Sequence, residues 1–386
     1  MTFSITSPLS RTTHRIAVGA LFFLQGLCFS SWGSRIPSIQ QQLHLSEAQL
    51  GAVLFSLPVG LMLSLPFTGW LTSKIGSRKV VTIALFLYST TLVLIGLCQT
   101  TAQLVGTLFL FGFASNMANI SVNTQAVGVE NLYKKSIMAS FHGLWSLAGF
   151  AGAAVGTLMI GLEVQPLQHF LVMAAVVMAG VAVAYQFAVP KDAPTPANQP
   201  IFVKPDKALM GLGLIAFCSL ICEGAMFDWS GVYFQKVVQA EKAWIAAGYT
   251  AFMSTMAFTR FIADWLTTKL GLKRVLQFSG LVTAVGLTIA VLFPHMVTAI
   301  LGFLLVGAGV SAVVPLVYGV AGKTKTMAPS MALAAVSTIG FAGFLVGPPL
   351  IGLLAGISSL RLSFAVIALM GISVALLSSR IKTEEV

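Results

Sequence analysis

Twelve long apolar stretches, separated by short polar segments, make up most of this 386-residue chain. A helix needs about 20 mainly apolar residues to cross the roughly 30 Å hydrocarbon core of a bilayer. Internal prolines such as Pro58, Pro66 and Pro315 do not prevent spanning, because neighbouring helices can satisfy the backbone groups that they free. The predicted spans are residues 14–36, 48–72, 79–98, 102–128, 137–162, 166–189, 208–235, 243–268, 274–293, 296–321, 329–356 and 360–379. The sequence therefore predicts an all-α integral membrane protein with twelve transmembrane helices.

The composition agrees with a chain that is surrounded by lipid. Hydrophobic residues make up 57% of the sequence and charged residues only 9%, whereas ordinary soluble domains are about 25% charged. So small a charged fraction cannot cover the surface of a soluble enzyme, and so high an apolar fraction excludes a disordered chain.

The basic residues gather on one predicted side of the membrane. Of the 22 Lys and Arg residues, 17 lie in the termini or in the loops at 73–79, 129–136, 190–207, 269–274 and 322–328. The opposite side has only Arg35, Lys236, Lys242 and Arg361, and Arg260 lies inside a span. This bias predicts that both termini are cytoplasmic. A basic rim next to anionic lipid also accounts for the net charge of +11, so no nucleic-acid partner is expected.

The sequence contains an internal repeat. Residues 149–162 (GFAGAAVGTLMIGL) and 340–353 (GFAGFLVGPPLIGL) share nine of fourteen positions at an offset of 191, and Lys74–Val80 matches Lys269–Val275 at an offset of 195. Both offsets are close to half the chain length, which predicts two six-helix bundles in parallel orientation. The predicted bundles are residues 1–189 and 208–386, joined by a cytoplasmic linker at 190–207 that is rich in Pro and charge.

Motifs of enzymes and pumps are missing from the sequence. There is no P-loop, HExxH, GxSxG or dinucleotide fingerprint. Cys28, Cys98, Cys218 and Cys222 all lie in predicted spans, without a His or carboxylate at metal-ligand spacing, so we interpret them as packing residues. We expect no enzymatic activity, no metal and no cofactor.

The basic loop after the second span of each half carries a family resemblance. Residues 69–79, Gly-Trp-Leu-Thr-Ser-Lys-Ile-Gly-Ser-Arg-Lys, are similar to the G-x-L-x-D-R-x-G-R-R loop of the major facilitator superfamily, except that Ser73 replaces the usual Asp. In the second half Thr268 takes that position, and Asp264 lies one helical turn earlier. The chain as a whole resembles this superfamily, in particular its bacterial sugar-permease-like branches. The resemblance implies a transporter whose spans 1, 4, 7 and 10 line a central cavity.

Polar residues in those four spans are the predicted substrate site. Asn116, Asn119 and Asn123 share one helical stripe, and aligned amides suit a ligand rich in hydroxyl groups. The alternative is a hydrogen-bonded seam between helices. Span 1 adds Gln25 and Trp32, and span 10 adds Tyr318, which is the repeat partner of Asn123.

Ionisable residues at membrane depth are expensive and therefore candidates for proton coupling. Glu223 and Asp228 lie in span 7. Five residues apart, they point roughly 140° away from each other unless the helix breaks at Gly224. Glu223 lies near the midplane and Asp228 nearer the periplasm, so Glu223 is the predicted proton carrier.

Three further residues are candidate gate or charge-pair groups. We take His142 as the only histidine within a span, with either a structural role or a role as a gate or proton relay. Arg260 lies near the midplane in span 8. The simplest prediction is an intrahelical ion pair with Asp264, and the alternative is that Arg260 reaches the cavity or Glu223.

These observations predict a secondary active transporter that moves a small polar, sugar-like solute across the bacterial inner membrane by alternating access. A proton gradient is the expected energy source. The expected partners are the small-molecule substrate and the lipid bilayer, and a monomer is expected. Two alternatives stay open: a proton-linked exporter of amphipathic compounds, and a non-transporting membrane sensor or lipid-handling protein.

Overall fold

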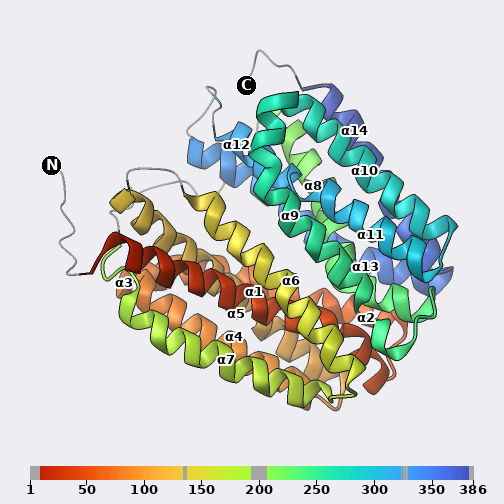
Figure 1. Ribbon diagram of the computed structural model, residues 1–386, viewed down its shortest axis with the longest axis horizontal. Helices are drawn as coiled ribbons and strands as arrows, with labels where there is room; N and C mark the ends of the chain where they lie inside the picture. Colours follow the sequence, from red (N-terminus) through yellow and green to blue (C-terminus); the bar gives the residue numbers. More distant parts are fainter. Residues whose placement is uncertain (1–8, 134–136, 193–206, 323, 325–328, 382–386) are drawn as a thin grey trace. The chain divides into compact units, whose positions relative to one another are not determined.

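The computed structural model describes residues 9–133, 137–192, 207–322, 324 and 329–381 (Figure 1). In these ranges all regular structure is helical. The chain divides into two compact units, Met1–His44 with Ser56–Thr195, and Leu45–Phe55 with Pro196–Val386. The predicted linker at 190–207 falls mostly outside the described residues, so the division of the chain at that loop stays a prediction.

In its described residues the first unit is a bundle of six helices in which α1 is central. The helix α1 packs against α5, α6 and α7, while α5 also packs against α3 and α4 (Figure 1). The Ser10 hydroxyl oxygen accepts a hydrogen bond from the Thr13 N–H at the start of α1, and Pro166 occupies the first position of α7. The helices are α1 (Arg11–Gln42), α3 (Ser56–Ile75), α4 (Ser77–Leu97), α5 (Thr101–Tyr133), α6 (Met138–Gly161) and α7 (Pro166–Phe187).

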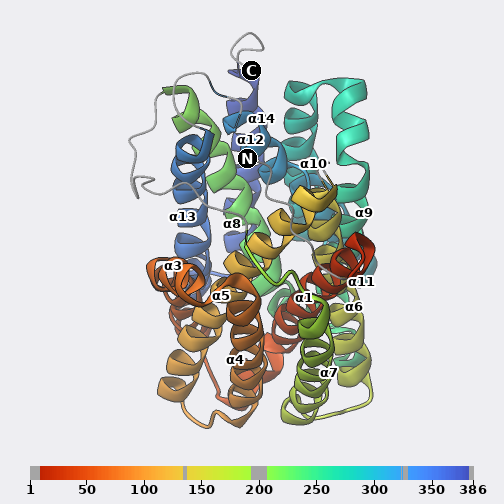
Figure 2. The same ribbon diagram turned by 90° about the vertical axis from the view of Figure 1, so that its left-hand side faces the viewer.

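The second unit is built around α8, which packs against both α13 and α14 (Figure 2). The helix α10 packs against α11 and α14, and α9 packs against α11. The helices are α2 (Glu47–Leu54), α8 (Lys207–Lys236), α9 (Ala247–Leu270), α10 (Leu272–Leu292), α11 (Met296–Val310), α12 (Val313–Ala321), α13 (Pro329–Ile357) and α14 (Leu360–Ser379), with a short 3-10 helix η1 (Lys242–Trp244) before α9.

Among the described residues, eleven helical segments are long and apolar enough to cross a membrane. The twelfth predicted stretch is α9, which has 24 residues and is made more polar by Arg260, Asp264 and Lys269. Two spans consist of two helices each, Glu47–Ile75 and Met296–Ala321. The predicted fold class, an all-α membrane protein, is confirmed.

Prolines explain why these two spans are broken. A proline has no N–H to donate to the carbonyl four residues before it, and its ring crowds that carbonyl. Pro58 stands four residues after Leu54, where α2 ends, and Pro315 stands four residues after Ser311, which follows α11. The chain thus spans the membrane at both places, but with an interruption of the helix.

The predicted repeat is visible in how the helices pack. In α6, a side chain at Gly152 would place its Cβ 2.9 Å from Cβ of Ser30 in α1. In α13, a side chain at Gly343 would place its Cβ 2.6 Å from the carbonyl oxygen of Phe217 in α8. The matching glycines therefore permit the same close helix contact in each unit.

The two predicted basic loops are each reduced to a single glycine between helices. Gly76 joins α3 to α4 and Gly271 joins α9 to α10, with φ of 85° and 80° and the same ψ of 149°. Only glycine adopts this backbone conformation readily. The two halves thus share a turn geometry as well as a sequence.

A segment from the first half of the sequence packs in the second unit. The short helix α2 begins with a capping box formed by Ser46 and Gln49 and packs against α13. A side chain at Gly51 would place its Cβ 2.7 Å from the carbonyl oxygen of Pro348, and one at Gly352 would lie 2.7 Å from the carbonyl oxygen of Glu47. Glu47 also forms an ion pair with Lys236 at the end of α8.

Candidate substrate and coupling site

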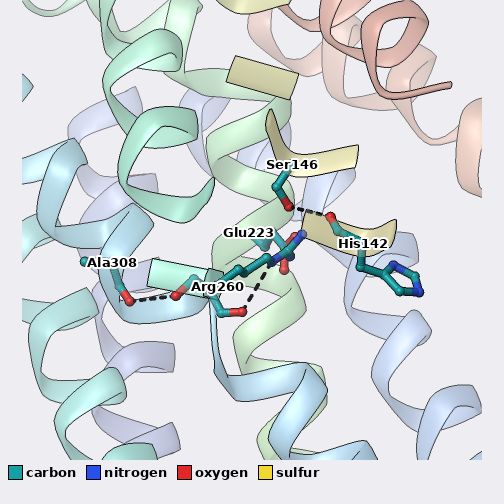
Figure 3. A network of polar contacts seen from close by, with 6 residues as sticks. His142, Ser146, Glu223, Arg260 and Ala308 are labelled. Carbon is teal, nitrogen blue, oxygen red and sulfur yellow. Dashed lines mark hydrogen bonds and ion pairs between the residues drawn. The ribbon is translucent and has the colours of Figure 1, made fainter. Parts of the chain in front are cut away.

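Glu223 of α8 and Arg260 of α9 form an ion pair inside the second unit (Figure 3). Nη2 of Arg260 lies 3.2 Å from Oε1 of Glu223, and the side chains of Arg260 and Glu223 are 16% and 7% exposed. Two opposite charges so little exposed to solvent depend on each other, because an unpaired charge is costly to bury. The alternative prediction, that Arg260 reaches Glu223, is confirmed by this contact. The side chain of Asp264 lies outside the described residues, so the intrahelical pair stays a prediction.

Arg260 also contacts the broken tenth span. Its Nε donates to the carbonyl oxygen of Ser311 over 3.4 Å. Ser311 is fully buried, and its carbonyl is the one that Pro315 leaves without a helical donor. The guanidinium therefore joins three elements of the second unit: the carboxylate on α8, its own helix α9, and the break between α11 and α12.

The second carboxylate of α8 is placed differently. The helix runs unbroken through Gly224 from Lys207 to Lys236, so Glu223 and Asp228 do not form a stacked pair. Asp228 is only partly buried by its accessible surface, and it makes no hydrogen bond or ion pair with another described residue. It is thus separate from the Glu223–Arg260 pair.

The three predicted asparagines of α5 do not all serve the same purpose. Nδ2 of Asn116 donates to the Ser64 hydroxyl at 2.8 Å and to the Leu61 carbonyl at 3.0 Å, both on α3. Asn116 thus takes part in a hydrogen-bonded seam between α3 and α5, which is the predicted alternative to a substrate site. Asn119 and Asn123 instead bond to each other along α5, with Nδ2 of Asn123 lying 3.1 Å from Oδ1 of Asn119. Both are only partly buried.

Gln25 and Trp32 of α1 carry buried polar atoms without a described partner. Nε2 of Gln25 donates to the Ser115 carbonyl at 3.3 Å, but its Oε1 has no hydrogen-bond partner among the described residues, and neither has Nε1 of Trp32. Gln25 is 4% exposed and Trp32 is 1% exposed. Buried polar atoms are rarely left unpaired, so this acceptor and this donor are available to a water molecule or a ligand.

His142 and Tyr318 occupy less buried positions. The side chain of His142 on α6 is exposed, and its ring packs edge-on against the Phe22 ring, with the two centroids 5.4 Å apart. The Ser146 hydroxyl donates to the His142 carbonyl at 3.1 Å (Figure 3). Tyr318 of α12 is partly buried and packs against the apolar core of the second unit.

The prediction that His142 is the only histidine within a span is wrong. His14 lies in α1 and His169 in α7, and both are almost completely buried. Nε of Arg35 donates to Nδ1 of His169 at 3.1 Å, and Nη2 donates to the Val164 carbonyl at 2.9 Å. Arg35, predicted to lie on the side opposite the basic loops at the end of the span 14–36, is thus buried inside α1. The one sequence feature that could have indicated this buried contact is the presence of His169 in an apolar stretch.

Sequence reasoning also missed a polar network at the start of α4. Asp192, which follows α7, accepts hydrogen bonds from the Ser77 backbone N–H at 2.7 Å and from the Ser77 hydroxyl. Gln125 of α5 donates to the Ser77 hydroxyl and bonds both backbone groups of Val189. A carboxylate at a helix N-terminus is favourable. Asp192 therefore supplies a negative charge at the start of α4. The Ser73 hydroxyl instead donates to the Trp70 carbonyl within its own helix.

The four cysteines are free and buried, as predicted for packing residues. Among the described residues, no group of three or more His, Cys, Asp or Glu side chains is placed to hold a metal ion.

Comparisons with known proteins address the family. The profile described as Major Facilitator Superfamily matches residues 18–323 and 239–385. An uncharacterized MFS-type transporter of Yersinia pestis is 34% identical over 364 residues, which cover 94% of each chain. The crystal structure of a mutant of the nucleoside transporter NupG superimposes with a TM-score of 0.75 at 16% identity, over 95% of this chain and 98% of that one.

A third similar protein is a proton symporter. The crystal structure of a variant of the E. coli fucose:proton symporter FucP superimposes with a TM-score of 0.64 at 14% identity, over 95% of this chain and 98% of the symporter. At such low identity the two solved structures show the fold alone, while the profile and the Yersinia relative show the family. The chain therefore belongs to the Major Facilitator Superfamily and is a membrane transporter rather than an enzyme.

Proposed function

We propose that this transporter moves a small polar solute by proton-coupled alternating access, with Glu223 as the proton carrier. The observation that carries the proposal is the contact of 3.2 Å between Glu223 and Arg260, with both side chains little exposed. Ionisable groups within a membrane span are functional candidates by default. No cofactor is needed, because the proton gradient supplies the energy.

The pair can exist in two charge states. With Glu223 ionised, Arg260 neutralises it. With Glu223 protonated, the carboxyl group needs no counter-charge, while the guanidinium keeps its hydrogen bond to the Ser311 carbonyl. Proton binding therefore changes the net charge of this cluster by one and favours a different arrangement of α8, α9 and the break in the tenth span. A bound proton shifts the equilibrium between two conformations if it binds one of them better.

For the substrate, we propose a neutral solute rich in hydroxyl groups, such as a sugar. Oε1 of Gln25 and Nε1 of Trp32 are a buried acceptor and a buried donor without a described partner, on residues about 10 Å apart along α1. In the first unit Asn119 and Asn123 are further proposed contacts, whereas Asn116 uses its N–H groups within the α3–α5 seam. In the second unit Tyr318 is a proposed contact. Nucleosides and fucose, named for two proteins of similar fold, are hydroxyl-rich compounds and the first to test.

A thermal-shift screen of the purified protein against sugars, nucleosides, amphipathic drugs and lipids identifies the ligand class, because a ligand of the folded state raises apparent stability. Proteoliposomes with an imposed pH gradient then test coupling. Glu223→Gln should still bind and exchange the solute across the membrane but should lose accumulation on the gradient, because its amide cannot carry a proton.

Asp228→Asn is the matched control and should retain accumulation. Accumulation by Glu223→Gln together with loss in Asp228→Asn would reverse the two roles. If neither variant changes accumulation, the protein is a facilitator or uses another group such as His142. Binding of amphipathic drugs but not of sugars or nucleosides would favour the exporter.

We propose a bacterial inner-membrane location, a monomer, and both termini in the cytoplasm, as the distribution of Lys and Arg predicts. Reporters fused after Lys135, after Ala197 and at Val386 should read cytoplasmic, and one after Gly161 periplasmic. A periplasmic reading at Ala197 would contradict six spans in the first half.

A further inference from the structure

The two units each carry a tryptophan with a lysine over its ring. In α3, Nζ of Lys74 lies 4.9 Å from the centroid of the Trp70 ring, and in α9, Nζ of Lys269 lies 5.6 Å from that of Trp265. Trp70 and Trp265, like Lys74 and Lys269, are separated by the 195 residues of the internal repeat. The spacing i, i+4 places each ammonium above its own indole on one helix face. The same arrangement thus occurs in both units.

Each pair stands at the end of an exposed apolar stripe. On α3 the stripe consists of Leu63, Phe67 and Trp70, which are 57%, 42% and 54% exposed. On α9 it consists of Phe258, Phe261 and Trp265, which are 66%, 58% and 59% exposed. From the first stripe residue to the lysine each helix rises about 16 Å over eleven residues, close to the roughly 15 Å depth of one hydrocarbon leaflet. The lysines therefore mark the level of the lipid headgroups.

Both ammonium groups lack an anionic partner within the described part of the chain. Lys74 and Lys269 are exposed and make no ion pair or hydrogen bond there. The glycine turns at Gly76 and Gly271 then bring a further exposed cation, Lys79 or Arg274, into the first turn of the next helix.

Nearby groups of the first unit are already satisfied. The Arg78 guanidinium donates to the Tyr185 carbonyl and stacks on that ring, and Asp192 is bound by Ser77. The charge left over beside the first stripe is therefore positive.

We propose that each of the two Trp–Lys pairs is a binding site for an anionic phospholipid. An acyl chain lies along the apolar stripe, the indole sits at the membrane interface, where tryptophan is enriched, and the lysine ammonium binds the phosphate. A zwitterionic lipid such as phosphatidylcholine carries its own quaternary ammonium, which the unpaired lysine and the neighbouring cation would repel. The occupant is thus a lipid with a net negative headgroup, such as phosphatidylglycerol.

Fluorescence quenching by brominated lipids tests the proposal in full-length protein reconstituted into vesicles. Brominated phosphatidylglycerol or brominated phosphatidylcholine is added at the same mole fraction to a phosphatidylcholine bilayer. The emission of Trp70 and Trp265 is obtained as the difference between the wild type and Trp70→Phe or Trp265→Phe. We expect about fivefold enrichment of the anionic lipid at these indoles, the factor that one lysine near an anionic headgroup contributes. High salt should reduce it.

Lys74→Gln and Lys269→Gln should abolish the preference for the brominated anionic lipid while leaving quenching by the zwitterionic lipid in place. Two matched controls separate this from general basicity. Lys191→Gln removes an exposed cation that has no described indole beneath it, and Trp244, 51% exposed, is an indole without a described lysine over its ring. Equal quenching by both lipids in the wild type, or a preference that survives the double lysine replacement, would overturn the proposal.

Discussion

Nη2 of Arg260 lies 3.2 Å from Oε1 of Glu223, which connects α9 to α8 through a charged contact. The same guanidinium contacts the carbonyl oxygen of Ser311. A side chain that bonds two different elements transmits a change in one of them to the other.

The first prediction is that Arg260 and Glu223 are energetically coupled. A double-mutant cycle with Arg260→Ala and Glu223→Gln, read by thermal unfolding in detergent, should give a coupling of about 1–3 kcal/mol, because residues in one ion pair are not additive. A second cycle with Arg260→Ala and Asp264→Asn is the control. If the larger coupling belongs to Asp264, the intrahelical pair is the dominant one.

The second prediction concerns the break in the tenth span. Pro315→Ala supplies an N–H that can bond the Ser311 carbonyl and thereby compete with Arg260. We expect higher thermal stability and slower transport, since a hydrogen bond worth about 1 kcal/mol that must break in every cycle lowers turnover about fivefold. Pro66→Ala, inside the unbroken helix α3, is the control and should leave turnover unchanged. Unchanged transport in Pro315→Ala would show that the break plays no part in the cycle.

The third prediction concerns the network at the start of α4. Gln125→Ala removes bonds to Ser77 and to both backbone groups of Val189, which leaves buried groups unsatisfied, and should lower the free energy of unfolding by about 2–3 kcal/mol. Asp192→Ala should cost about 1 kcal/mol as the loss of a helix cap. Ser73→Ala, which loses a bond within its own helix, should be neutral. Equal midpoints for all three variants in thermal denaturation would refute this account.

The fourth prediction concerns the buried pair of Arg35 and His169. Because arginine can only donate, Nδ1 of His169 is the acceptor and the neutral ring carries its proton on Nε2. His169→Ala leaves the Arg35 Nε without this acceptor and should destabilise by about 1–3 kcal/mol. His169→Gln retains an acceptor and should recover part of that loss. His142→Ala, at an exposed position, should have little effect on the unfolding midpoint, and a loss as large as that of His169→Ala would contradict the assignment.

The sequence predicts well those features that depend on local patterns. Long apolar runs mark the helices, and the two glycine-rich segments mark matching close contacts at Gly152 and Gly343 because only the absence of a side chain allows such an approach. Gly76 and Gly271 keep the same positive φ for a similar reason.

Partners across the fold are harder to predict. Asp264 is the simplest partner to expect for Arg260 because the spacing i, i+4 can be read from the chain, whereas Glu223 becomes a partner only through the packing of α8 against α9. Asn116 meets Ser64 across 52 residues of sequence. The hydropathy pattern ends the first span at residue 36, just after Arg35, whereas the hydrogen bonds of Arg35 to His169 and Val164 allow α1 to continue to Gln42.

The helix α2 lies early in the sequence but packs against α13, which lies near its end. Residues Leu45–Phe55 come before the predicted linker but belong to the second unit. A protein cut at Ala197 would therefore give a first fragment that carries a docking helix, with Gly51 ready to meet Pro348 and Glu47 ready to meet Lys236. In the intact protein α2 of the first fragment packs against α13 of the second, as an exchanged element does in a domain-swapped dimer. Two such fragments produced separately in one membrane could therefore recognise each other through α2.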